Sequence, residues 1–306
     1  MDTTLLVIAT GGLAVLALLL VARLSSRGGA AARPARARHA LAVAGRLLQL
    51  IAHVQQHRGM SGAWLAGDQS FATRLPDKQA AVERLFAEVR AGIEAENGEA
   101  YPCLVTADVD VLHGRWRKVV GELAAITPEE SFQAHCRIVA TLLDWLAALV
   151  DARIQAPLMT VIKTAATRNF SHRLPVLAEC LGQARALGST VAARGECRPV
   201  SRVRLMFLVA RAEALLAQAS DGACDGSAAA RIEAARAVKT FAAAVRDELL
   251  APGAIALGAG DCFALGTRGV DAVFAWLEIE RRDLAAKLAE RRAVVPMPGA
   301  AAGVAS

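Results

Sequence analysis

Aromatic side chains and strand-like patterns are scarce in this sequence, and their scarcity argues against a β-sheet protein. Phe, Trp and Tyr make up 4% of the 306 residues, whereas hydrophobic residues as a whole reach 55%. Much of the apolar content is therefore Ala and Leu, which are strong helix formers. No alternating runs of Val, Ile, Thr and Tyr lie between turn signals, as half-buried strands require. The sequence predicts an all-α fold.

Paired cysteines and catalytic motifs are also lacking. The cysteines are scattered singly, without a C-x-x-C pair, so we expect no disulfide framework. His53 and His57 are four residues apart on one predicted helix, but no third metal ligand and no catalytic Glu accompanies them. No nucleophile with a base and no phosphate-binding loop is evident. We therefore expect neither an enzyme nor a metal or other cofactor. The cysteines are residues 103, 136, 180, 197, 224 and 262.

The excess of positive charge is confined to one short segment. The formal net charge is +6, but five arginines against a single acid, Asp2, precede residue 39. The rest of the chain carries 30 basic and 28 acidic residues, which is close to balance. We therefore expect no basic face for nucleic acid. The five arginines are residues 23, 27, 33, 36 and 38.

Residues 5–22 carry no charge and are long enough to cross a membrane. As a helix, this stretch would measure about 27 Å. A cleaved signal peptide would require a basic residue before the apolar run, but the four residues there, Met1–Thr4, contain none. The arginines follow the span instead. The positive-inside rule then places the N-terminus outside and the rest of the chain in the cytoplasm. We expect residues 1–24 to anchor the protein in a bacterial inner membrane as a single pass, with a cleaved signal peptide as the alternative.

Beyond the span, the sequence predicts a linker, a large helical region and a tail. Residues 25–38 are small and basic, as in a juxtamembrane linker, and residues 293–306 should be disordered. Short loops between helices of residues 39–292 indicate two packed antiparallel helical bundles. The helices expected there are residues 39–66, 72–96, 102–125, 128–152, 175–194, 199–220, 228–250 and 262–292, with Pro157 and Pro175 interrupting the chain on either side of residues 158–174.

Arg58 lies on the apolar face of the first of these helices. Ile51 and Leu65 lie seven residues before and after it, and Val54 and Ser61 share the same face at helical spacing. A guanidinium among core residues is unfavourable unless something anionic meets it. Two interpretations fit this pattern: Arg58 pairs with a Glu or reaches water, or it binds an anionic ligand.

Arg185 repeats this pattern on a later helix. Ala178 and Leu181 precede it, and Gly188 and Ser189 follow, at helical spacing. The small residues leave space beside the guanidinium that a larger side chain would otherwise fill. They are equally typical of close helix packing, so both a ligand pocket and a tight helix contact remain open.

Three stretches resemble the nitrate- and nitrite-sensing domain family of bacterial signalling proteins. Arg58-Gly-Met-Ser61 is similar to the family's Arg-Gly-x-Ser, and Gln79 marks a following Gln-Arg helix, although Ala80 replaces the Arg. Glu179-Cys-Leu-Gly-Gln-Ala-Arg-Ala186 is similar to Glu-x-x-Gly-x-x-Arg-Ala. A weaker likeness covers 263–271, which includes Arg268. The resemblance spans about residues 40–285.

The resemblance implies two helical bundles that bind nitrate or nitrite between arginines. Carried over by position, Arg58 and Arg185 are the ligand-binding candidates, with Arg268 as a weaker third. A planar guanidinium suits a planar oxyanion because it donates two parallel hydrogen bonds. Family members usually carry an output module, and none is evident here. We therefore expect a membrane-anchored sensor that signals through an unknown protein partner, with a homodimer as one option. A helical scaffold that has lost ligand binding is the alternative.

Overall fold

The computed structural model describes the backbone of residues 3–99, 101–155 and 164–294, and the side chains of residues 33–99, 101–155 and 165–290. This part of the chain forms helices and no strands, so the predicted all-α class is confirmed. The helices are α1 (Thr3–Leu65), α2 (Leu75–Ile93), α3 (Thr106–Gly121), α4 (Pro128–Val150), α6 (Thr164–Arg168), α7 (Leu174–Arg194), α8 (Pro199–Asp221), α9 (Ala228–Ala244) and α10 (Ala259–Val294).

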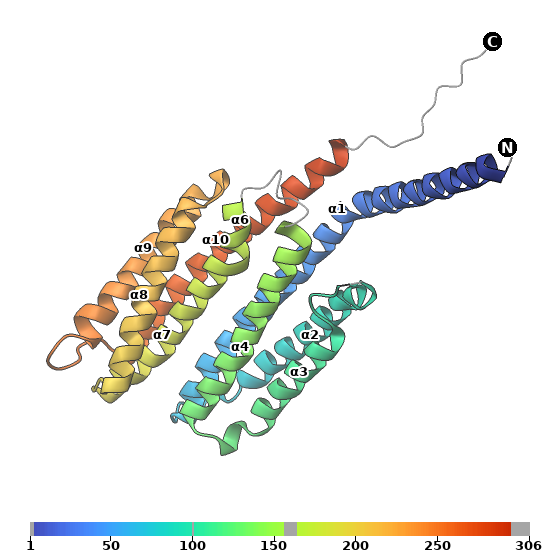
Figure 1. Cartoon of the computed structure of the whole chain (residues 1–306). Coiled ribbons are helices and arrows are strands. Elements are labelled where there is room, and N and C mark those ends of the chain that lie inside the picture. Colours follow the sequence, from blue (N-terminus) through green and yellow to red (C-terminus); the bar gives the residue numbers. More distant parts are fainter. Residues whose placement is uncertain (1–2, 100, 156–163, 295–306) are drawn as a thin grey trace, which may run out of the picture.

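Two bundles lie side by side in the molecule (Figure 1). The first consists of α1, α2, α3 and α4, and the second of α7, α8, α9 and α10. Helices α1 and α4 of the first bundle contact α7 of the second, and α1 also contacts α10. A single apolar core of Ala, Leu, Val and a few aromatic side chains continues through both bundles. The functional candidates lie where the two bundles meet.

Helix α1 is longer than the sequence analysis predicted. It continues for 63 residues and includes residues 25–38, where we expected a linker. Pro34 lies inside it, and Ala37 is already fully buried. The difference has a physical reason: the segment is rich in Ala and Arg, which favour helix, and a helix extends readily from a packed neighbour.

Among the residues that the structure describes, no helix is long and apolar enough to cross a membrane. The expected span, residues 5–22, belongs to the N-terminal part of α1, whose side chains lie outside the described residues. Residues 295–306, most of the expected tail, also lie outside them.

The helix ends follow local sequence signals. At the start of α4, the Thr127 hydroxyl accepts a hydrogen bond from the Glu130 amide at 3.2 Å, and the Glu130 carboxylate accepts one from the Thr127 amide at 2.9 Å. This reciprocal cap, with Pro128 in the first turn, fixes the start of α4 where the sequence predicts it. Helix α7 ends at Gly195, whose φ of +65° suits glycine.

Candidate functional site: two buried arginines between the bundles

Arg58 joins the two bundles through a buried ion pair. It projects from α1 with 2% of its surface exposed and meets Glu179 of α7. Its Nη1 donates to Oε1 of Glu179 at 2.5 Å and its Nη2 donates to Oε2 at 3.2 Å. This two-pronged pairing is the arrangement that a guanidinium and a carboxylate favour. The structure therefore shows the simpler of the two interpretations for Arg58: a Glu partner.

The Glu179 carboxylate has further donors around it. Gln55, one turn before Arg58, donates to it at 2.8 Å, and Gln183 donates at 2.7 Å. Burial alone would lower the pKa of Arg58, but the Glu179 carboxylate and Cys136 beside it raise that pKa above its ordinary value. Arg58 is therefore held as a cation whose charge is largely compensated.

Arg185 is buried without a carboxylate in contact, although Asp271 and Glu179 attract it from further away. It projects from α7 with 5% of its surface exposed, and its Nη1 donates to the hydroxyl of Thr267 on α10 at 2.9 Å. Its guanidinium lies over the ring of Phe263, 4.8 Å from the ring centre. Its Nε has no hydrogen-bond partner, and no carboxylate forms an ion pair with Arg185 in the described part of the chain. Burial, and then repulsion from Arg58, lower the pKa of Arg185 to about 10.

Glycines allow the helices to approach at both arginines. A Cβ placed on Gly266 of α10 would lie 2.6 Å from the Cβ of Arg185, a distance that real side chains do not adopt. On α7, a Cβ at Gly182 would lie 2.9 Å from Nη2 of Arg58. Gly188, which follows Arg185 in the sequence, also lies at a close contact, because a Cβ there would lie 2.9 Å from Sγ of Cys262. This glycine therefore serves close helix packing, the second interpretation left open above.

The two arginines approach one another across the bundle interface. Gly59, directly after Arg58, has its Cβ position 3.9 Å from Nη2 of Arg185 and 3.7 Å from the ring of Phe263. The segment of α1 that carries Arg58 thus contacts the guanidinium of Arg185. Two positive groups are adjacent here, and one carboxylate, Glu179, lies in contact with only one of them.

Aromatic rings cover both guanidiniums. Phe132 of α4 lies between Arg58 at 5.4 Å and Arg204 of α8 at 5.3 Å, measured to the ring centre. Phe263, which covers Arg185, is 38% exposed. In each case the positive guanidinium lies over an aromatic ring, and the quadrupole of the ring attracts it. They also connect the arginine pair to the outer surface of the second bundle.

Arg268, the third candidate, is exposed on α10 and makes no ion pair or hydrogen bond within the described residues. Its neighbour Thr267 faces Arg185 in its place. Sequence reasoning also missed Glu179, Phe132 and Phe263 as members of the site. The signal for Glu179 was available, because it opens the Glu-x-x-Gly-x-x-Arg motif and a buried arginine requires an anionic partner.

A second buried polar cluster lies behind Arg58 in the first bundle. His57 Nδ1 and His135 Nε2 are 2.8 Å apart, and the other ring nitrogen of His135 lies 2.6 Å from the Ser131 carbonyl oxygen. Gln79 reaches the second nitrogen of His57 at 3.3 Å, and the edge of His57 packs against Trp116. Burial lowers the pKa of His57 to about 3 and that of His135 to about 4, so both are neutral at pH 7. With both rings neutral, the contacts form one chain, in which Gln79 donates to His57, His57 donates to His135 and His135 donates to the Ser131 carbonyl oxygen.

Metal binding at His53 and His57 has no support in the described side chains. In that part of the molecule, no three His, Cys, Asp or Glu residues lie together as metal ligands would. His53 lies beside Lys78 instead, with 3.4 Å between their nitrogen atoms.

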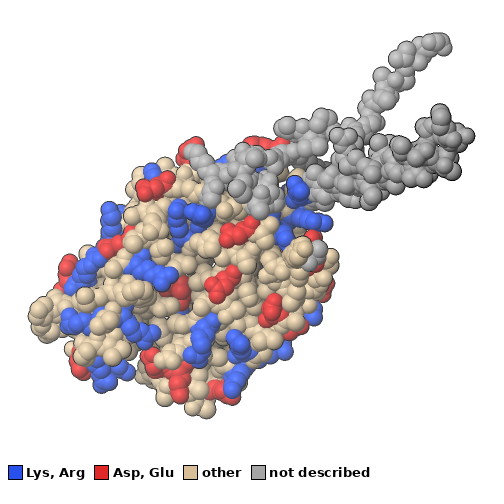
Figure 2. Space-filling model, in the orientation of Figure 1, with Lys and Arg blue, Asp and Glu red and all other residues tan. Residues whose placement is uncertain are grey.

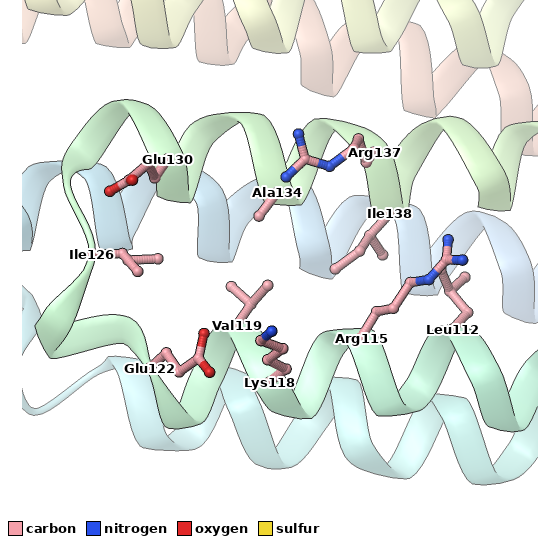
Figure 3. A pocket seen from close by; sticks show the side chains of 10 residues that line it. All are labelled: Leu112, Arg115, Lys118, Val119, Glu122, Ile126, Glu130, Ala134, Arg137 and Ile138. Carbon is pink, nitrogen blue, oxygen red and sulfur yellow. The ribbon is translucent and has the colours of Figure 1, made fainter.

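A groove of about 420 Å³ lies between α3 and α4, and neither Arg58 nor Arg185 lines it (Figure 3). Apolar side chains from both helices, such as Leu112 and Ile138, face one another across it. Arg115, Lys118 and Arg137 line it as well, with carboxylates at Glu122 and Glu130. None of the three predicted ligand-binding arginines contributes to this groove.

The family assignment follows from the comparison with known sequence families. A model described as nitrate and nitrite sensing matches residues 49–279. The chain belongs to this family. The matched segment includes Arg58, Glu179, Arg185 and Thr267, so the whole arginine cluster is part of the nitrate- and nitrite-sensing domain.

Comparison with solved structures agrees with this assignment at the level of the fold. The structure of the NasR transcription antiterminator is similar, with a TM-score of 0.65 over 90% of this chain and 75% of that chain. The two sequences are 20% identical, so the likeness shows a shared fold. No curated protein matches the sequence.

Proposed function

We propose that this protein is a sensor, and not an enzyme, that binds nitrate or nitrite between Arg58 and Arg185. The observation that carries the proposal is the unpaired edge of the Arg185 guanidinium. Nε has no partner and Nη2 makes no hydrogen bond within the described residues, whereas Nη1 is used by Thr267. Nε and Nη2 form one edge of the fork, which suits two oxygens of a planar anion.

The electrostatics support the same ligand class. A buried cation without an anionic partner is unfavourable, and the lowered pKa of Arg185 expresses this. A monovalent oxyanion at the Nε–Nη2 edge would neutralise Arg185. It would also lie beside Arg58, because Nη2 points towards the Gly59 segment of α1. Arg268 takes no part in the proposed site.

The test is the dependence of thermal stability on the anion. Nitrate or nitrite should raise the melting temperature of the full-length protein in detergent more than chloride does at equal ionic strength. At 100 times the dissociation constant, linkage contributes about 2.7 kcal/mol. Arg185→Lys should remove the difference, because an ammonium lacks the planar fork. Arg268→Lys is the matched control and should behave like the wild type.

The alternative function is a helical scaffold that has lost its ligand. The pairing of Arg58 with Glu179 favours this alternative, because that guanidinium needs no further anion. A scaffold predicts no specific effect of nitrate or nitrite on any variant. If nitrate, nitrite and chloride act alike on the wild type, the sensor proposal for these ligands is wrong.

We also propose that residues 5–22 anchor the protein in a bacterial inner membrane, with the remainder in the cytoplasm and a protein partner receiving the signal. The support is the uncharged stretch followed by five arginines. A reporter enzyme that works only in the cytoplasm should be active when it is fused after Ser306, and one that works only in the periplasm should be inactive there. Activity of a periplasm-specific reporter at this position would overturn the orientation.

A further inference from the structure

Helix α8 carries an apolar stripe that no other helix of the described chain covers, although Arg211 of α8 itself lies over the ring of Phe207, 5.9 Å from its centre. Val200, Val203, Met206 and Phe207 are between 56% and 72% exposed, and all lie on the N-terminal half of this helix. In the C-terminal half, the exposed residues continue as alanines: Ala210, Ala214 and Ala217. Large apolar side chains exposed together on one surface mark an interaction site.

The spacing of the stripe is that of a coiled-coil seam. Residues 200, 203, 207, 210, 214 and 217 follow one another at alternating steps of three and four. This repeat keeps the stripe straight along one side of a helix, so a second helix can cover it over its whole length. The opposite side of α8, which includes Leu205 and Leu208, is buried against the second bundle.

We propose that this stripe is the interface with a second copy of the chain, formed by parallel pairing of α8 with α8. A two-fold axis along the helices brings each stripe residue opposite its own equivalent. The small alanines allow close approach in the C-terminal half, while Val and Phe fill the wider N-terminal half.

The size of the surface supports a dimer. If the exposed areas of its seven side chains were all covered, the stripe would bury roughly 600 Å² per copy, or about 1,200 Å² in total, which reaches the lower end of stable interfaces. A short peptide would cover only part of an apolar stripe that follows most of a helix of 23 residues. A partner helix of equal length and pattern fits this surface.

Two of the charged groups beside the stripe are paired within the chain, whereas Arg211 is exposed and lies over the ring of Phe207. Arg204 forms an ion pair with Glu129 of α4 at 3.2 Å, and Arg246, in the turn just after α9, donates to Glu213 at 2.7 Å. Over the face of the molecule shown in Figure 2, positive and negative side chains alternate and no large area of one sign stands out. A second copy of the same chain, which carries the same mixture of charges, is compatible with this surface.

The parallel orientation rests on the proposed membrane anchor. The N-terminal part of α1 leaves the bundles at one end, roughly along their long axis (Figure 1). A two-fold axis parallel to α8 keeps both N-terminal helices at the same end, so that both can enter one membrane. An antiparallel pair would direct them to opposite ends.

The interface also lies close to the arginine site. Arg204, one turn from Val200 on α8, covers the outer side of Phe132, and Arg58 lies against the same ring. A change in the position of Arg58 would therefore reach α8 through a single aromatic ring. The dimer itself does not depend on anion binding, so it can be tested separately.

Cysteine cross-linking in membranes tests both the surface and its orientation. Ala217→Cys in the full-length chain should give a disulfide-linked dimer on mild oxidation, because in the parallel pair residue 217 faces its own equivalent. In an antiparallel pair the two cysteines would be about 25 Å apart along the axis. Wild type and Ala229→Cys, an exposed position on α9, give the background from the native cysteines. A cross-link formed only between Val200→Cys and Ala217→Cys chains would overturn the parallel arrangement.

A charge on the stripe tests the surface without cross-linking. In detergent, the wild type should have the mass of a dimer by light scattering, and Val203→Asp should reduce it to that of a monomer. Val111→Asp is the matched control, because Val111 is a similarly exposed valine on α3 of the other bundle, and it should leave the dimer intact. A monomeric wild type, or a dimer that Val203→Asp does not weaken, would overturn the proposal.

Discussion

Replacing Glu179 with Gln should lower the free energy of unfolding by about 3–5 kcal/mol, because it leaves the fully buried Arg58 cation without its partner. The two remaining donors to the carboxylate, Gln55 and Gln183, cannot compensate, since neither carries a negative charge. Chemical unfolding of wild type and variant in a chloride buffer measures the difference. Glu213→Gln is the matched control: its partner Arg246 is near the surface, so the loss should stay below about 1 kcal/mol.

The same variant connects stability with the proposed ligand. With Glu179 neutral, Arg58 gains free donors next to Arg185, and a bound oxyanion could contact both guanidiniums. Nitrate should therefore restore part of the stability that Glu179→Gln loses, and stabilise the variant more than the wild type. A variant whose stability falls by less than about 1 kcal/mol would show that the buried ion pair matters little. A full loss that nitrate does not reduce would count against the anion site.

Acidification should destabilise the protein well above the pH at which carboxylates titrate. His57 and His135 have folded pKa values of about 3 and about 4, below the ordinary value of 6.5. Because the unfolded chain takes up protons first, the stability that these neutral histidines contribute is complete above pH 6.5 and is lost as the pH falls below it. Between pH 7.5 and pH 5 the pair should lose about 4 kcal/mol.

The structure explains why these histidines resist protonation. Their contacts are Gln79, Ser131 and Trp116, and the charges that act on them are the cations Arg58 and Lys78. No carboxylate pairs with either ring in the described residues. Unfolding at several pH values should show the loss in the wild type and a flatter profile in the His57→Gln/His135→Gln double variant. Equal wild-type stability at pH 7.5 and pH 5 would contradict the prediction.

Local sequence signals predicted the helices well because those signals act within a few residues. The Thr127–Glu130 cap and the glycine at 195 fix helix ends through contacts that are close in the chain. The expectation that helix begins only at residue 39, after residues 25–38, was wrong for the opposite reason, because α1 includes this segment. Its small and basic residues are compatible with either state, and continuity with the packed part of α1 decides for helix.

The sequence predicted that the two arginines of the candidate site are buried, but it did not predict which residues they contact. Burial of Arg58 and Arg185 follows from their place on apolar helix faces, and both are buried. The pairing of Arg58 with Glu179 joins residues 121 positions apart, and that of Arg185 with Thr267 spans 82 positions. Helical periodicity carries no information on such contacts, because they depend on how the two bundles pack. Arg268 shows the same limit, since a motif position alone does not state which side of α10 faces inward.

The positions of α1 and α10 give the arginine pair a mechanical consequence. These helices contact one another at the site, where a Cβ at Gly59 of α1 would lie 3.7 Å from Phe263 of α10, and they meet again further along, where a Cβ at Gly45 of α1 would lie 3.6 Å from Arg281 of α10. Ala37 lies about 30 Å of helix away from Arg58, so a tilt of α1 of about 3° at Arg58 displaces Ala37 by about 1.6 Å. Such a tilt would make α1 a lever that turns beside the guanidiniums, and the helices packed along it, α2, α4 and α10, would have to shift with it. A movement of atomic size between two charged groups would then become, at the far end of α1, a displacement comparable to the helix shifts by which receptors switch.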